Sequence, residues 1–102
     1  MKINAEDVDY TKEDYNVFLN GKLIKACVGF NTEDQSVTIL DIKKIAPLNI
    51  VDGEREYVTK KLFGTLLIHK FVYEKDCVHE YTFTNDNDMK LVNIFSLRLN
   101  ND

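Results

Sequence analysis

The fold class is decided by one stretch, residues 15–28, which reads Tyr15-Asn16-Val17-Phe18-Leu19-Asn20-Gly21-Lys22-Leu23-Ile24-Lys25-Ala26-Cys27-Val28. Tyr15, Val17 and Leu19 stand at every second position, which is the period of a strand and not of a helix. The dipeptide Asn20-Gly21 is the pair that best supports a type I′ turn, because both residues accept a positive φ. The stretch therefore predicts a β-hairpin.

Strand patterns continue on the C-terminal side of this hairpin. Gly29 and the polar segment 31–35 predict a second turn into a strand over 36–42, so that three antiparallel strands form a meander. Further strands are expected over 55–62, 65–73 and 77–84, with a turn at Phe63-Gly64. The long apolar run from Thr65 to Tyr73 indicates a central strand with both faces covered.

The two ends of the chain are less regular. Residues 1–14 carry five carboxylates against two lysines, which predicts an acidic arm or one short helix. Residues 89–99 fit either a strand or a helix capped by Asp86 or Asp88. We favour the strand because Val92, Ile94 and Phe95 are poor helix formers.

Length and composition limit the architecture. The 102 residues, 44% hydrophobic and 29% charged, suffice for one domain, 1–102, with the arm over 1–14 and a β domain over 15–102. We expect a mainly β fold: a small antiparallel barrel or a sandwich of six to seven strands with at most one short helix. No apolar run reaches the length of a membrane span, and we expect a cytoplasmic protein without membrane contact.

Two cysteines and two histidines are the candidates for a metal centre. Cys77 and His79 stand two apart on an expected strand and so share a face, and Cys27 and His69 would have to supply the other ligands of a Cys2His2 zinc site. The paired spacing that such sites use, Cys-x2-Cys or His-x3-His, does not occur. We expect reduced, largely buried thiols and no bound metal.

Other chemistry finds little support in the residue pattern. The only serines are Ser36 and Ser96, and neither stands in a Gly-x-Ser-x-Gly motif. No glycine-rich phosphate loop is present, and the acidic segment 85–88 lacks the glycine and the glutamate of a calcium loop. We therefore expect no catalytic residue, no cofactor and no enzymatic activity.

Charge is distributed unevenly along the chain, whose net charge is −4. The middle is basic and contains interleaved aromatic residues, a mixture typical of oligonucleotide-binding barrels. The candidate nucleic-acid contacts there are Lys43, Lys44, Lys60 and Lys61. Acidic residues gather toward the C-terminal third and could meet a basic protein partner. The candidate partner-binding residues are Asp76, Glu80, Asp86 and Asp88.

About half of the chain resembles small, functionally uncharacterised proteins of tailed bacteriophages and prophages. The likeness runs from Tyr15 to Leu40, with a Tyr-x-Val-x-x-Asn-Gly opening, a following cysteine, an acidic turn and a strand. It resumes from Thr59 to Ile68 with a Phe-Gly segment before an apolar strand, and no counterpart is recognised after Lys70.

The resemblance implies a phage origin, a β fold and the cytoplasm of a bacterial host cell. From this resemblance and the residue pattern we expect a non-enzymatic accessory protein that acts by protein–protein contact, as a virion or assembly component. An apolar strand within residues 91–99 could form a homodimer by strand addition. One alternative is an inhibitor of a bacterial defence system whose acidic patches block a basic site, and another is the oligonucleotide-binding barrel.

Overall fold

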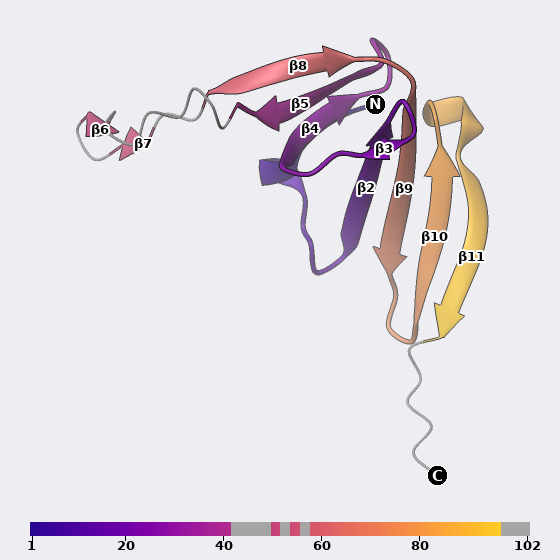
Figure 1. Cartoon of the computed structure of the whole chain (residues 1–102). Helices are drawn as coiled ribbons and strands as arrows, with labels where there is room; N and C mark the ends of the chain where they lie inside the picture. Colours follow the sequence, from indigo (N-terminus) through magenta and orange to yellow (C-terminus); the bar gives the residue numbers. More distant parts are fainter. Residues whose placement is uncertain (42–49, 52–53, 56–57, 97–102) are drawn as a thin grey trace.

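The computed structural model describes residues 1–41, 50–51, 54–55 and 58–96, in which two antiparallel sheets account for most of the chain (Figure 1). Sheet A has the order β1 (Lys2–Asn4), β4 (Cys27–Asn31), β5 (Ser36–Leu40), β8 (Thr59–Phe63). Sheet B has the order β11 (Lys90–Ser96), β10 (Cys77–Phe83), β9 (Leu66–Tyr73), β2 (Glu13–Leu19), β3 (Lys22–Leu23). A separate pair joins β6 (Ile50–Val51) to β7 (Glu54–Arg55).

The mainly β prediction is confirmed, and the barrel alternative is wrong for the part of the chain that the structure describes. Each sheet ends in edge strands, so neither is closed. Figure 1 shows sheet A crossing over one end of sheet B, while the other end of β9, β10 and β11 extends past it. The number of strands exceeds the expected six to seven, because short segments such as β1, β3, β6 and β7 also pair.

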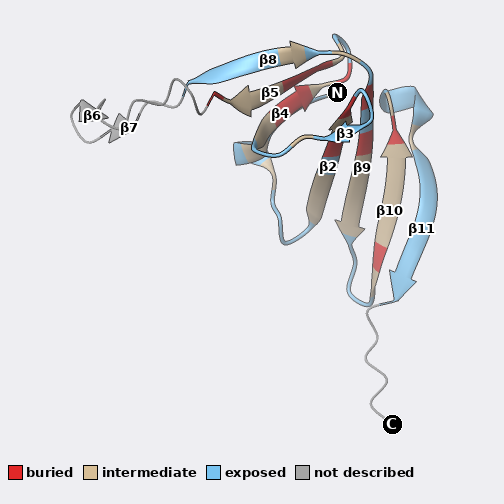
Figure 2. Cartoon of the chain, viewed as in Figure 1, coloured by how far each residue is buried: buried red, intermediate tan, exposed pale blue. Residues whose placement is uncertain are grey.

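The core lies where the two sheets face each other. Its members alternate along their strands with more exposed neighbours, as one-sided burial requires. Sheet A supplies Phe30 and Val37, and sheet B supplies Val17, Leu19, Leu66, Ile68 and Phe83. Figure 2 shows the buried segments concentrated at this contact and the outer strands left exposed. The contact between the sheets therefore accounts for most of the burial.

The hairpin predicted from Asn20-Gly21 is confirmed. Asn20 and Gly21 have φ angles of 51° and 83°, and Leu19 pairs with Lys22. The expected three-stranded meander is wrong, because β3 has only two residues and the chain then crosses to sheet A. Ala26 makes the crossing with a φ of 57°, a conformation that the alternating pattern alone does not signal.

Strand β9 lies centrally in sheet B, between β10 and β2, as its long apolar run predicts. The expectation that both of its faces are covered is wrong. Leu66 is fully buried against sheet A, whereas its neighbour Leu67 points away from it and is 38% exposed. Sheet A covers only the inner face of β9. The apolar side chains on its other face are not fully covered by any described residue.

The N-terminal segment is more ordered than the expected acidic arm. Lys2 pairs with Asn31 and Asn4 with Gly29, so β1 is a strand of sheet A, and a 3-10 turn, η1 (Ala5–Asp7), replaces the expected short helix. A second 3-10 turn, η2 (Asp86–Asp88), follows β10, and Asn85 caps it by accepting a hydrogen bond from the Asn87 amide.

The ambiguous C-terminal element is a strand over Lys90–Ser96, as the poor helix propensity of its residues indicates, and residues 97–99 of that prediction lie outside the described part. Among the residues described, no helix has the length and apolarity that crossing a membrane would need.

Candidate protein interface

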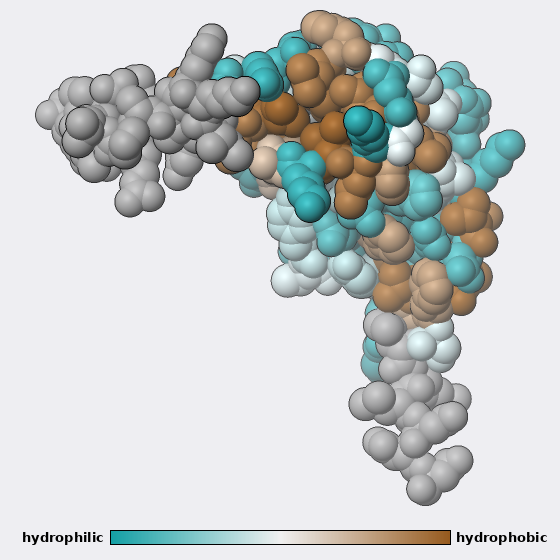
Figure 3. All heavy atoms as spheres, in the orientation of Figure 1, coloured by the Kyte–Doolittle hydropathy of each residue, from teal (hydrophilic) through white to brown (hydrophobic). Residues whose placement is uncertain are grey.

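Strand β11 is an exposed apolar edge. It pairs with β10 on one side and ends sheet B on the other, and all seven of its residues are exposed (Figure 2). Its four large apolar side chains, Leu91, Val92, Ile94 and Phe95, are 44–54% exposed. Figure 3 shows apolar side chains gathered along this edge, on the right of the view. Such an edge is a template on which another strand can pair.

The other sheet edges differ from β11 in length or in charge. β1 and β3 have three and two residues, too few to offer a long ladder. β8 is longer and ends on the exposed Phe63, but it carries Lys60 and Lys61 in its middle. Lysines on an edge strand discourage pairing with another chain, because pairing would desolvate their charge. Among the described edges, β11 alone combines seven residues with four large apolar side chains.

A β-bulge places the apolar side chains of β11 on both faces of sheet B. Val78 pairs with Phe95, and His79 pairs with Ile94. The register then shifts between Glu80 and Tyr81, so that Val92 stands opposite no residue of β10. Phe95 lies on the outer face, away from sheet A. Ile94 lies on the inner face. Sheet A covers only the part of that face near Phe83, at the other end of β10. A partner strand would therefore gain apolar contacts above and below the sheet.

On the outer face, the apolar surface continues from β11 across two more strands. Tyr73, Val78 and Phe95 form one cross-strand row, since Val78 faces Tyr73 on one side and Phe95 on the other. Val78 is buried between these two exposed aromatic neighbours. The alternation along β9 and β10 is the sequence signal of this row, which was not among the predicted site residues.

The four acidic candidates for partner binding do not lie together. Asp76 precedes β10 and stands at one end of that strand, whereas Asp86 and Asp88 belong to η2 beyond its other end. Glu80 lies in the middle of β10, with its carboxylate 3.1 Å from His69 Nδ1 on the outer face. The structure therefore divides these carboxylates among three places.

Besides Glu80, two more of these carboxylates have intramolecular partners. Asp86 Oδ2 lies 2.9 Å from the Met1 ammonium, which also donates to Thr32 Oγ1 at 2.8 Å. Asp88 Oδ2 accepts hydrogen bonds at 2.7 Å from the Thr84 hydroxyl and from the Asn85 side chain. Both groups hold the β10–β11 connection in place.

The basic candidates are also dispersed. Lys60 and Lys61 are consecutive on β8, so their side chains leave opposite faces of sheet A. Lys61 Nζ lies 3.4 Å from Asp34 Oδ2 and is paired with it. Lys43 and Lys44 lie outside the described residues. The described part of the chain thus offers no row of lysines along one strand face.

The cysteines and histidines are not brought together as one site. Cys77 Sγ lies 3.9 Å from His79 Nδ1, as expected for residues on the same face of a strand. His69 points to the opposite face of sheet B, and Cys27 belongs to sheet A. Among the described residues, no three potential ligands cluster, so the structure does not bring these four side chains together. Both thiols are free and half-buried.

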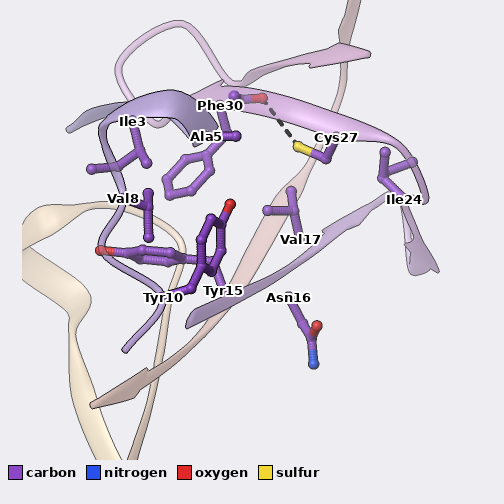
Figure 4. A pocket seen from close by; sticks show the side chains of 11 residues that line it. Ile3, Ala5, Val8, Tyr10, Tyr15, Asn16, Val17, Ile24, Cys27 and Phe30 are labelled. Atoms are coloured by element: carbon purple, nitrogen blue, oxygen red, sulfur yellow. Dashed lines mark hydrogen bonds between the residues drawn. The ribbon is translucent and has the colours of Figure 1, made fainter. Parts of the chain in front are cut away.

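A small apolar cavity of about 70 Å³ opens between the start of the chain, β2 and β4 (Figure 4). Tyr15 and Phe30 contact each other edge to face there, with ring centroids 5.5 Å apart, and the Cys27 thiol donates to the Gly29 carbonyl. Burial raises the pKa of the Cys27 thiol, which keeps it protonated and weakly nucleophilic. Burial and the nearby Glu13 raise the pKa of Tyr15 to about 12. The cavity is far below the roughly 300 Å³ of a typical small-molecule site.

Comparisons with protein-family models, with curated proteins and with solved structures find no match.

Proposed function

We propose that this chain is a non-enzymatic accessory protein of the tailed-phage type that acts by protein–protein contact, as a virion or assembly component. The observation that carries the proposal is the edge strand β11, which presents four large exposed apolar side chains and pairs with no described strand on its outer side. The mode of contact is strand addition, in which backbone hydrogen bonds supply affinity and alternate side chains supply specificity.

The size of the apolar patch supports this role. Four side chains that are each about half exposed present on the order of 400 Å² of apolar surface, divided between the two faces of sheet B at one edge. A partner strand would remove part of that surface from water at roughly 25 cal/mol per Å². An edge of this kind left open is also an aggregation hazard, so a dedicated partner explains its presence.

The two alternative functions have less support. An inhibitor that uses Asp86 and Asp88 would have to compete with the Met1 and Thr84 contacts of these carboxylates. An oligonucleotide-binding surface would need lysines on one face, and Lys60 and Lys61 leave opposite faces of β8.

The proposal is tested by a binding assay with a matched pair of variants. Ile94→Lys places a charge on the edge strand, and Leu67→Lys places the same charge on the outer face of the central strand β9, where the side chain is also exposed. Tagged protein is incubated with untagged copies and, separately, with host lysate. Wild type and Leu67→Lys should retain the same partner, and Ile94→Lys should lose it at least tenfold. Equal retention by Ile94→Lys, with its circular dichroism unchanged, would refute a contact through β11.

A further inference from the structure

We infer that the cavity between the start of the chain, β2 and β4 is an anchor pocket for one branched aliphatic side chain, of leucine or valine, that a basic peptide segment presents. The inference goes beyond the proposed function, because it places a second contact site on the molecule that does not involve β11. In sheet B, β9 and β10 separate β2 from β11. The two sites are therefore three strand spacings apart, about 14 Å.

The walls of the cavity are apolar side chains from elements that the fold brings together. Ala5 and Val8 come from η1 and the residue that follows it, Val17 from β2 and Phe30 from β4 (Figure 4). Tyr10 also lines the cavity and is 54% exposed, so part of the wall lies at the molecular surface. An aliphatic group that enters from that surface would contact apolar side chains on several sides.

The volume of the cavity sets the size of the group that it accepts. An apolar protein cavity of about 150 Å³ holds a benzene molecule, which has six carbon atoms. At about 70 Å³, this cavity accepts roughly three carbon atoms, which is the branched end of a leucine or valine side chain and not an aromatic ring. Water is a poor occupant, because it needs about two to four polar partners and the Cys27 thiol already donates to the Gly29 carbonyl.

The wall at the start of the chain is held in place by its own hydrogen bonds. The Val8 amide donates to the Ala5 carbonyl at 3.2 Å, and the Lys12 amide donates to the Asp9 carbonyl at 2.9 Å. The Asp9 carboxylate accepts hydrogen bonds from the Thr11 hydroxyl and amide, which lower the pKa of Asp9 and keep it ionised at neutral pH. The occupant therefore meets a preformed wall, and binding loses little free energy to ordering.

The charge beside the cavity favours a basic partner. Residues 5–14 contain five carboxylates and one lysine. Glu6 and Asp7 are exposed, stand between the cavity-lining residues Ala5 and Val8, and have no ion pair within the described part of the chain. Lysine or arginine residues beside the anchoring side chain would be attracted to these carboxylates, and added salt would weaken that attraction.

Methyl NMR of the intact chain tests the cavity with three synthetic peptides, all acetylated and amidated. They are Lys-Lys-Leu-Lys-Lys, the same peptide with alanine at its centre, and Glu-Glu-Leu-Glu-Glu. The first should shift the methyl signals of Val8 and Val17 and leave those of Leu91 and Val92 on β11 unchanged. It should bind roughly tenfold or more tightly than the alanine peptide, because alanine leaves the cavity unfilled. The acidic peptide should bind more weakly than the first at low salt.

Variants of the chain supply matched controls. Ala5→Leu fills the cavity from within and should weaken binding of Lys-Lys-Leu-Lys-Lys roughly tenfold or more, whereas Ala5→Ser leaves the cavity open and should bind as the wild type does. Glu6→Gln combined with Asp7→Asn should weaken binding at low salt. The same two changes of charge at Glu33 and Asp76, which are exposed and do not line the cavity, should have a smaller effect.

The outcomes decide between an anchor pocket and an unused cavity. Equal affinity for the leucine and alanine peptides, or no saturable shift at millimolar concentration, overturns the inference. Unchanged binding by a folded Ala5→Leu variant also overturns it, and if that variant does not fold, the comparison of the peptides on the wild type decides. Tighter binding of the acidic peptide overturns the basic partner. Ile94→Lys should bind the peptide as the wild type does, so this inference and the proposed function fail separately.

Discussion

Gly64 lies directly against the side chain of Asn20, so that a Cβ added at position 64 would come within 2.7 Å of Asn20 Nδ2 and Oδ1. The same amide oxygen accepts a hydrogen bond from the Thr65 amide at 2.9 Å, and the Asn20 amide donates to the Thr65 carbonyl at 2.8 Å. Asn20 therefore has two roles: it forms the β2–β3 turn, and it holds the turn through which the chain passes from sheet A to sheet B.

We predict that Gly64→Ala destabilises the protein by about 1–3 kcal/mol, the usual cost of forcing atoms into a packed site. The added methyl must displace the Asn20 side chain and break its bond to Thr65. Urea denaturation followed by circular dichroism measures the change. In an Asn20→Ala background the same substitution should cost less, since the obstructing amide is absent, and an equal cost in both backgrounds would contradict this origin.

A second prediction concerns the two faces of β9. Leu66 is fully buried and Leu67 is 38% exposed, although they are consecutive. Leu66→Ala should lower the free energy of unfolding by about 2–5 kcal/mol, because it leaves a cavity in the core. Leu67→Ala should change it by less than about 1 kcal/mol. Chemical denaturation of both variants gives the comparison, and similar losses would show that the outer face is also covered.

The sequence shows local structure better than it shows which sheet a strand joins. Asn20-Gly21 indicates its turn because few dipeptides accept two positive φ angles. The crossing at Ala26 has no such signal, since alanine rarely adopts a positive φ and does so here only because the tertiary structure requires it. For that reason the sequence pattern indicates a continuous meander where the chain changes sheets.

The candidate site was predictable in part. The apolar residues of β11 indicate a strand that could pair, and the structure places that strand at an edge. The separation of Asp76 from Asp86 could have been predicted, because the expected strand over 77–84 places the residues that flank it at opposite ends, more than about 20 Å apart. Charge along a chain indicates a patch only after the strands have been placed.

A third prediction concerns Asp86, which pairs with the Met1 ammonium at 2.9 Å. Asp86→Asn should lower stability by about 0.5–1 kcal/mol, the usual range for a partly exposed pair, and the loss should shrink at high salt. Asp76→Asn removes the same charge from a residue without an ion pair among those described, and serves as the control. Thermal unfolding at low and at high salt measures both. Equal effects of the two substitutions would indicate a response to net charge and not to the pair.

The last prediction concerns Tyr15, whose pKa is raised to about 12 by burial and by the neighbouring Glu13. Its folded pKa lies above the unfolded value of about 10, so the unfolded state releases the proton more readily. The stability from neutral Tyr15 is therefore complete below pH 10 and is lost as the pH rises toward 12. Tyrosinate absorbance during an alkaline titration, with circular dichroism recorded in parallel, should show a late step that Tyr15→Phe removes and Tyr10→Phe keeps. A late step that survives in Tyr15→Phe would assign the high pKa to another tyrosine.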